Sequence, residues 1–134
     1  MPFTLINPES LGGPRGYSNG ILCEPGGRFL FVAGQIGWDE KQMIVSEDFV
    51  EQFDRALGNV LSVVQEAGGS AGQIARMVVY VTNKREYVEQ TRGIGERYRA
   101  RMGKHFPAMT LVEVKGLLDP AARVEIEAIA VLSP

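Results

Sequence analysis

The run MVVYVT at residues 77–82 constrains the fold most, because it is apolar at consecutive positions rather than at alternate ones. A strand that is half buried alternates apolar and polar residues, whereas a strand covered on both faces is apolar throughout. FLFVAG at 29–34 has the same character and is bounded by Gly27 and Gly34. The sequence therefore predicts a sheet whose central strands are covered on both faces.

Two helices are predicted, which is too few to cover such a sheet. Between Asp48 and Ala67 apolar residues recur at steps of three and four, Ser46 or Asp48 can cap the start, and Gly68 follows the end. The apolar positions of this helix are Phe49, Phe53, Ala56, Leu57, Val60, Leu61 and Val64. A second helix follows the strand at 77–82, and its inward positions are Tyr87, Thr91, Ile94 and Tyr98.

The remaining strands complete one α/β sandwich. GILCEP at 20–25 precedes FLFVAG across a Pro-Gly-Gly turn, which predicts an antiparallel hairpin. MTLVEV at 109–114 and VEIEAIAV at 124–131 alternate with a period of two. The predicted order is β-β-α-β-α-β-β in a single domain spanning 1–134. Because two helices cover only one face of a sheet, we expect copies of the chain to associate over the other face.

Charge and composition exclude several classes of partner. Fourteen basic against sixteen acidic side chains give a net charge of −2, which offers no general attraction for nucleic acid or anionic lipid. No apolar run approaches the roughly 18 residues that a membrane span needs, and MPFTLINPES lacks the pattern of a secretory signal. We expect a cytoplasmic protein without nucleic-acid or membrane partners. The single cysteine, Cys23, rules out an intramolecular disulfide.

Few residues carry chemistry by their spacing alone. Glu125 and Glu127 share one face of the last predicted strand, where they form either a functional pair or an exposed strand end. His105, the only histidine, has no partner acid or nucleophile at a diagnostic spacing, so we predict a surface histidine and no metal site. The basic run RYRAR at 97–101 is explained by its place at a helix C-terminus.

Six segments nevertheless come in a recognisable order along nearly the whole chain. They are PRGYSNG (14–20), FLFVAGQIGWD (29–39), QEAGG (65–69), VVYVTN (78–83), HFPAMTLVEV (105–114) and VEIEAIAV (124–131). This ordered set resembles the reactive intermediate deaminase family, also called Rid, YjgF-like or endoribonuclease L-PSP-like. The resemblance implies a chorismate-mutase-like fold, with a mixed six-stranded sheet, two helices on one face, and sheets packed in a homotrimer.

The same resemblance implies an activity and a site. Members of the family hydrolyse reactive imines and enamines to 2-oxo acids and ammonia in clefts between subunits, without a metal or an organic cofactor. Matched residue by residue, the glutamate that holds the attacking water falls on Glu125, and the family tyrosine falls on Tyr17. The family's SGQ motif appears here as Ala33-Gly34-Gln35, which makes Gln35 a candidate for substrate binding.

The chain departs from the family at the residue that holds the substrate carboxylate. The arginine of the family's PAR motif is Met109 here, and the position two residues on, often a cysteine, is Leu111. A methionine cannot bind a carboxylate, whereas the planar fork of arginine does so with paired hydrogen bonds. Either Arg15 or Arg92 replaces the missing group, or the substrate carries no carboxylate.

Two classes of function therefore remain, and a third is weaker. The first is a cofactor-free hydrolase in which Glu125 holds water and Tyr17 shapes the pocket. The alternative is a non-catalytic oligomer that binds a small molecule in a cleft made more apolar by Met109 and Leu111. RNA cleavage rests on an older family name alone, and the acidic balance and the absence of a histidine pair argue against it.

Overall fold

The computed structural model describes residues 3–134 and contains six strands and three α-helices within that range. The strands are β1 (Phe3–Ile6), β2 (Gly20–Cys23), β3 (Arg28–Ile36), β4 (Ile74–Val81), β5 (Ala108–Glu113) and β6 (Val124–Leu132). The helices are α1 (Phe49–Glu66), α2 (Lys84–Glu89) and α3 (Thr91–Met102). Two short 3-10 helices, Glu9–Leu11 and Ala71–Gln73, precede β2 and β4.

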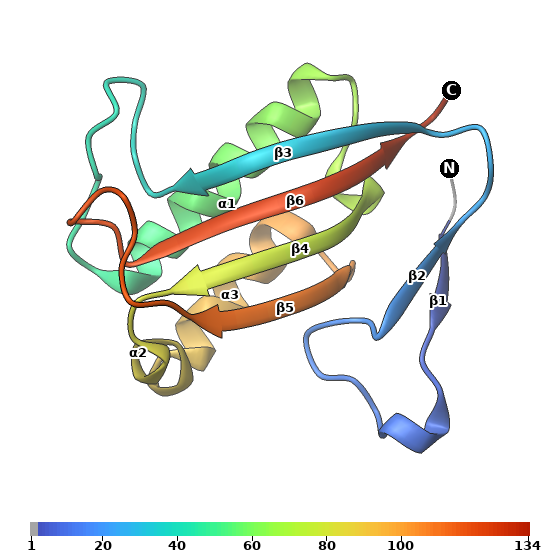
Figure 1. Cartoon of the computed structure of the whole chain (residues 1–134), viewed down its shortest axis with the longest axis horizontal. Coiled ribbons are helices and arrows are strands. Elements are labelled where there is room, and N and C mark those ends of the chain that lie inside the picture. Colours follow the sequence, from blue (N-terminus) through green and yellow to red (C-terminus); the bar gives the residue numbers. More distant parts are fainter. Residues whose placement is uncertain (1–2) are drawn as a thin grey trace.

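A four-stranded mixed sheet lies in front of the helices in Figure 1. Its strand order is β3-β6-β4-β5, in which β4 and β5 are parallel and the other neighbours are antiparallel. The helices lie on one face, as predicted, and the fold is the expected mixed α/β sandwich. None of the helices described in residues 3–134 is long and apolar enough to cross a membrane.

Helix α1 confirms the periodicity of the sequence. The Asp48 carboxylate accepts a hydrogen bond from the Glu51 amide at 3.0 Å and so caps the helix. After Ala67 the chain turns at Gly68, whose φ is 89°. All seven predicted apolar positions are buried against the sheet, and each of the six that are larger than alanine contributes roughly 1.5–3 kcal/mol by its burial. Gln52, which the apolar pattern did not include, is also buried.

The second predicted helix is two helices. The chain breaks at Gln90, whose φ and ψ are −112° and 23°, and this break rotates the face that follows. Ile94 and Tyr98 are buried as predicted, but Thr91 is exposed and its hydroxyl donates to Val88 O at 2.7 Å. Gly93 permits the close packing of α3 on α1, because a Cβ there would lie 3.3 Å from Val50 Cγ2.

The predicted hairpin between 20–25 and 29–34 is wrong. Strand β2 pairs with β1, from Phe3 opposite Cys23 to Ile6 opposite Gly20, and the two form a separate sheet. The six strands expected in one sheet are therefore divided into four and two. Figure 1 shows the β1–β2 hairpin beyond the start of β5, away from β3. Ser18 holds it there, since its amide donates to Pro107 O at 3.0 Å and its hydroxyl to Phe106 O at 2.6 Å.

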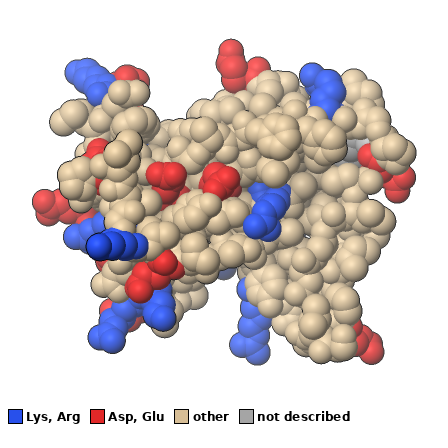
Figure 2. All heavy atoms as spheres, in the orientation of Figure 1, with Lys and Arg blue, Asp and Glu red and all other residues tan. Residues whose placement is uncertain are grey.

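The face of the sheet opposite the helices keeps large apolar side chains at the surface. Leu30 and Val32 pack against the core, so the alternation of β3 directs Phe29 and Phe31 to the other face. These two rings are 69% and 73% exposed. Figure 2 shows this side as largely uncharged, with a few acidic and basic groups near its centre. An exposed surface of this kind is typical of an interaction site.

The basic run at 97–101 is held by acidic residues of α1, which the sequence analysis did not predict. Asp54 accepts from Arg97 Nη1 at 2.9 Å and from Arg101 Nε at 2.7 Å, and Arg97 also pairs with Glu51. Burial raises the pKa of Asp54, but the hydrogen bonds and charges of Arg101 and Arg97 outweigh this effect and lower it below its ordinary value. These ion pairs join α1 to α3.

We expect Asp54 to make the stability of the protein depend on pH in the acid range. A carboxyl whose folded-state pKa is lowered stabilises the fold above its unfolded pKa, and this contribution is lost as the pH falls through the lowered value. Between pH 7 and pH 3, Asp54→Asn should therefore lose less unfolding free energy than the wild type in urea titrations. Glu66→Gln, at an exposed position near the end of α1, is the control. Equal losses in wild type and Asp54→Asn would contradict the assignment.

Candidate functional site

Glu125 lies at an irregularity in the sheet. It is on β6 between Ile36 of β3 and Tyr80 of β4, next to the register shift that separates Val32 from Gln35. Bulges of this kind re-aim side chains and are frequent beside active sites. The Glu125 carboxylate lies against Gly34 of the bulge, where a Cβ would come within 2.7 Å of the carboxyl carbon. Glycine at 34 is therefore required for this position of the carboxylate.

The two glutamates of β6 have different partners. The Tyr80 hydroxyl donates to Glu127, and this hydrogen bond, with burial and the charge of Glu125, raises the pKa of Tyr80. Within residues 3–134, no group hydrogen-bonds to the Glu125 carboxylate or forms an ion pair with it. Of these two carboxylates, Glu125 is therefore the one that has no hydrogen-bond partner on either oxygen within residues 3–134.

A hollow of about 490 Å³ opens beside Glu125. Its lining is mostly apolar and includes Gly34, Ile36, Trp38, Leu118, Asp119, Pro120 and Glu125. Trp38 and Leu118 were not predicted as site residues. Trp38 lies within the FLFVAGQIGWD segment (29–39) that carries the family resemblance, and this was the one sequence signal that could have found it.

A second hollow, of about 320 Å³, lies beside Met109 among aromatic side chains. It is lined by Arg15, Gly16, Phe53, Val79, Tyr87, Thr91, Ile94, Gly95, Tyr98, Arg99, Phe106 and Met109. The two arginines enter from different elements, Arg15 from the loop before β2 and Arg99 from α3. Burial raises the pKa of Tyr98, whose hydroxyl donates to His105 O at 2.6 Å. Arg99 was missed because the whole basic run was attributed to the helix terminus.

The structure brings some of the predicted residues together and separates others. Arg15 and Met109 line one hollow, and Leu111 packs on the core beside it. Met109 and Leu111 face the helices, whereas Glu125 faces the opposite side of the sheet. Arg92 lies outside the hollow, with a side chain that is 93% exposed and 3.7 Å from Glu96.

The other predicted residues lie apart from both hollows. Tyr17 is 37% exposed in the loop before β2. Gln35 donates to its own neighbour, Ala33 O, at 3.1 Å, on a shallow surface near α1. His105 is half-buried rather than on the surface, with Nε2 bonded to Ile74 O at 2.7 Å and its ring stacked on Phe3. His105 thus supports the packing at the start of β5.

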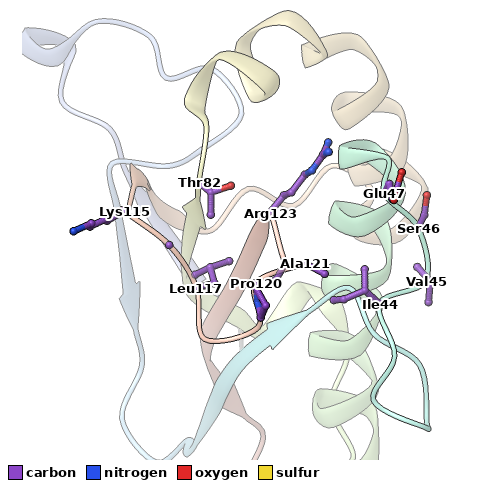
Figure 3. Close-up of a pocket in the computed structure, with 12 residues that line it drawn as sticks. Ile44, Val45, Ser46, Glu47, Thr82, Lys115, Leu117, Pro120, Ala121 and Arg123 are labelled. Atoms are coloured by element: carbon purple, nitrogen blue, oxygen red, sulfur yellow. The ribbon is translucent and has the colours of Figure 1, made fainter.

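A third hollow, of about 820 Å³, offers no converging charges. Figure 3 shows the loop before β6 on one side of it and the segment that leads to α1 on the other. Lys115 points away from the other labelled side chains, and Arg123 Nη1 donates to Glu86 Oε2 at 2.9 Å. Within the described part of the chain, no group of three or more His, Cys, Asp or Glu side chains could hold a metal ion. The hollows beside Glu125 and Met109 are therefore the candidate site.

The geometry defines a small α/β sandwich protein with a hollow of small-molecule size on each face of its sheet. The family model of endoribonuclease L-PSP matches residues 9–132. The chain therefore belongs to this family, whose members are also called Rid or YjgF-like proteins.

Relatives in the family share most of their length with this chain. A RutC family protein of Pyrococcus abyssi is 35% identical over 129 residues, which are 96% of this chain and 93% of the relative. A 2-iminobutanoate/2-iminopropanoate deaminase of Salmonella typhimurium is 34% identical over 108 residues, which are 78% and 80% of the two chains. The family supports an imine deaminase or a small-molecule-binding role.

Solved structures of the family differ in how well they match. The Rid family protein YyfB of Yersinia pestis has a TM-score of 0.87 at 29% identity, over 98% of this chain and all of its own. Escherichia coli TdcF with bound serine has a TM-score of 0.67 at 32% identity, over 90% of each chain. The protein that is closer in sequence is thus the more distant in structure.

Proposed function

We propose that the protein is a cofactor-free hydrolase of a small reactive imine or enamine, that it works as a homotrimer in clefts between subunits, and that Glu125 is its general base. The free carboxylate of Glu125 in an apolar hollow carries this proposal. A base must have acceptor capacity to spare and must lie within hydrogen-bond reach of the water it activates. Glu127 is less free, because Tyr80 already donates to one of its oxygens.

The reaction needs one water and one proton relay. Glu125 takes a proton from the water as the oxygen attacks the imine carbon, which gives a tetrahedral amino alcohol. Glu125 returns this proton to the former imine nitrogen, which completes the amino alcohol. The hydroxyl proton of the intermediate then passes to the nitrogen, the carbon–nitrogen bond breaks, and the products are a 2-oxo acid and ammonia. Every proton that leaves the water returns to the products, so no oxidant or reductant takes part.

The substrate carboxylate requires a cation, and Met109 cannot supply one. Arg15 and Arg99 both border the hollow beside Met109, and either guanidinium can take the role of the missing arginine. This hollow and Glu125 lie on opposite sides of the sheet, so a small substrate reaches both only where two copies meet. The serine bound by TdcF and the imino acids named for the Salmonella relative are both small molecules with a carboxylate.

Ammonia release tests the proposal directly. The purified protein should accelerate hydrolysis of freshly generated 2-iminopropanoate and 2-iminobutanoate above the rate in buffer. An amino acid oxidase in the same cuvette can supply the imine, and trapping the remaining imine with semicarbazide follows its loss. A rate equal to buffer for both imines would remove the deaminase proposal.

Arg15→Met should weaken substrate binding more than it slows chemistry. Hydrogen bonds to a charged group contribute about 1.5–3 kcal/mol, so we expect KM for an imino acid to rise about tenfold or more with a smaller change in kcat. Arg92→Met is the matched control, because Arg92 lies in solvent outside the hollow. Equal KM values for the two variants would shift the carboxylate-binding role to Arg99.

A non-catalytic role is the second candidate, and the aromatic lining beside Met109 favours it. Phe53, Tyr87, Tyr98 and Phe106 give this hollow an apolar surface suited to holding a ligand. In a thermal-shift screen of small metabolites, a binding protein should be stabilised by a compound that is recovered unchanged. If every stabilising compound is recovered chemically altered, this alternative fails.

A further inference from the structure

We propose that the β1–β2 hairpin of one copy adds to the free edge of β3 in a second copy, so that neighbouring subunits exchange arms. The arm is defined as residues 3–23, and the hinge as residues 24–27. Exchange of an identical element between protomers is a low-cost route to association, because the pairing that closes a single chain is reused between chains. Through this exchange a second copy of the chain would contribute its arm to the site around Glu125, and in this respect the inference rests on the proposed function.

The two sheets leave four outer edges without a partner strand within residues 3–134, on β1, β2, β3 and β5, and the edges of β2 and β3 are the ones that exchange would join. Strand β2 pairs with β1 alone, and β3 pairs with β6 alone, within residues 3–134. An unpaired edge presents a row of amide donors and carbonyl acceptors that template another strand. Both of the edges to be joined also carry exposed apolar side chains, with Leu22 57% exposed on β2 and Phe29 69% exposed on β3. The two edges are therefore complementary in hydrogen bonding and in polarity.

The arm does not reach β3 of its own chain in this conformation. Ser18 fixes the arm to Phe106 and Pro107 at the start of β5, and Phe3 stacks on the ring of His105. Strand β5 is at the opposite edge of the sheet from β3, with β4 and β6 between them. Figure 1 shows the arm beside β5 and the hinge crossing back to β3. The open edges of β2 and β3 are thus left for a second copy.

The register that exchange would reuse is that of a β2–β3 hairpin closed at the hinge, a pairing that this conformation does not form within one chain. The chain turns at Pro25 and Gly26, and a two-residue turn places Leu22 opposite Phe29 and Gly20 opposite Phe31. Continued along the same register, the partner's loop before β2 runs towards Gly34, against which Glu125 lies. Exchange therefore brings Tyr17 of one copy towards Glu125 of a second copy. The hollow that Arg15 and Met109 line in the first copy then also lies near Glu125 of the second.

Cross-linking two single-cysteine chains distinguishes exchange from a hairpin within one chain. Both chains carry Cys23→Ser, one also carries Leu22→Cys, and the other carries Phe29→Cys and a different tag. Residues directly opposite on antiparallel strands have Cα atoms about 4.5–5.5 Å apart, within the range of a disulfide. After the two chains are unfolded together, refolded and mildly oxidised, a non-reducing gel should show a covalent dimer that contains both tags.

The amount of mixed dimer distinguishes exchange from its absence. The amount of mixed dimer should exceed the amount of dimer that either chain forms alone. The pair Gly20→Cys and Phe31→Cys, farther from the hinge, should give the same excess of mixed dimer. No excess of mixed dimer with either pair, from chains whose circular dichroism shows them folded, overturns arm exchange. Ammonia release is measured separately, so cross-linking without activity removes only the deaminase proposal, and activity without cross-linking removes only the exchange.

Discussion

Glu125→Gln is expected to lower the rate of ammonia release from 2-iminopropanoate by about 100-fold or more. A positioned general base accounts for roughly 10²–10⁴ in rate, and glutamine keeps the size of the side chain but cannot accept a proton at neutral pH. The loss should appear in kcat, because the carboxylate acts on the water rather than on the substrate. The free energy of unfolding should change little, since the Glu125 side chain makes no ion pair or hydrogen bond within residues 3–134. Stopped or continuous ammonia assays, with urea titrations in parallel, measure both quantities.

Glu127→Gln is the matched control, because it removes a carboxylate from the same face two residues away. Glu127 is bonded to Tyr80, and its loss should leave kcat near the wild-type value. Gly34→Ala provides a second variant, since its added Cβ would force the Glu125 carboxylate away while keeping its charge. We expect Gly34→Ala to lower kcat as well. If Glu127→Gln and Glu125→Gln slow the reaction equally, Glu125 is not the base.

The main sheet and the first helix could be predicted from sequence because their signals are local. The apolar positions from Phe49 to Val64 recur with the helical period, and the strands at 77–82 and 124–131 have lengths and compositions typical of strands. The choice of partner strand is not local. The Pro25-Gly26 turn predicts a hairpin, but Ser18 holds the arm to residue 106, 88 positions along the chain. No pattern within a short window contains that contact.

The candidate site was predictable in part, and for a different reason. Glu125 was identified by resemblance, since strand alternation alone did not separate it from Glu127. The difference between them depends on Tyr80, which lies on another strand and reaches only one of the two. Arg99 was missed because a cation near a helix terminus has a sufficient local explanation. Gln52 was missed because it is a polar residue within an apolar face, where the hydrophobic pattern does not identify it.

Gln52→Leu is expected to lower the free energy of unfolding by about 2–4 kcal/mol, although leucine suits a buried position. The Gln52 side chain is 1% exposed and joins two loops to α1. Its Nε2 donates to Ser46 O at 2.9 Å and to Ala121 O at 3.1 Å, and its Oε1 accepts from Arg123 N at 2.8 Å. Leucine leaves these backbone groups without their partner, and a buried group left unsatisfied costs about 1–3 kcal/mol.

The same substitution should also affect the candidate site. The loop that Gln52 holds at Ala121 and Arg123 continues through Leu118, Asp119 and Pro120, which line the hollow beside Glu125. We therefore expect kcat to fall under conditions where the variant is still fully folded. Gln65→Leu, exposed near the end of the same helix, is the control and should leave stability and kcat close to wild type. A loss below about 1 kcal/mol for Gln52→Leu would mean that water replaces the three hydrogen bonds, because hydrated groups avoid most of the penalty.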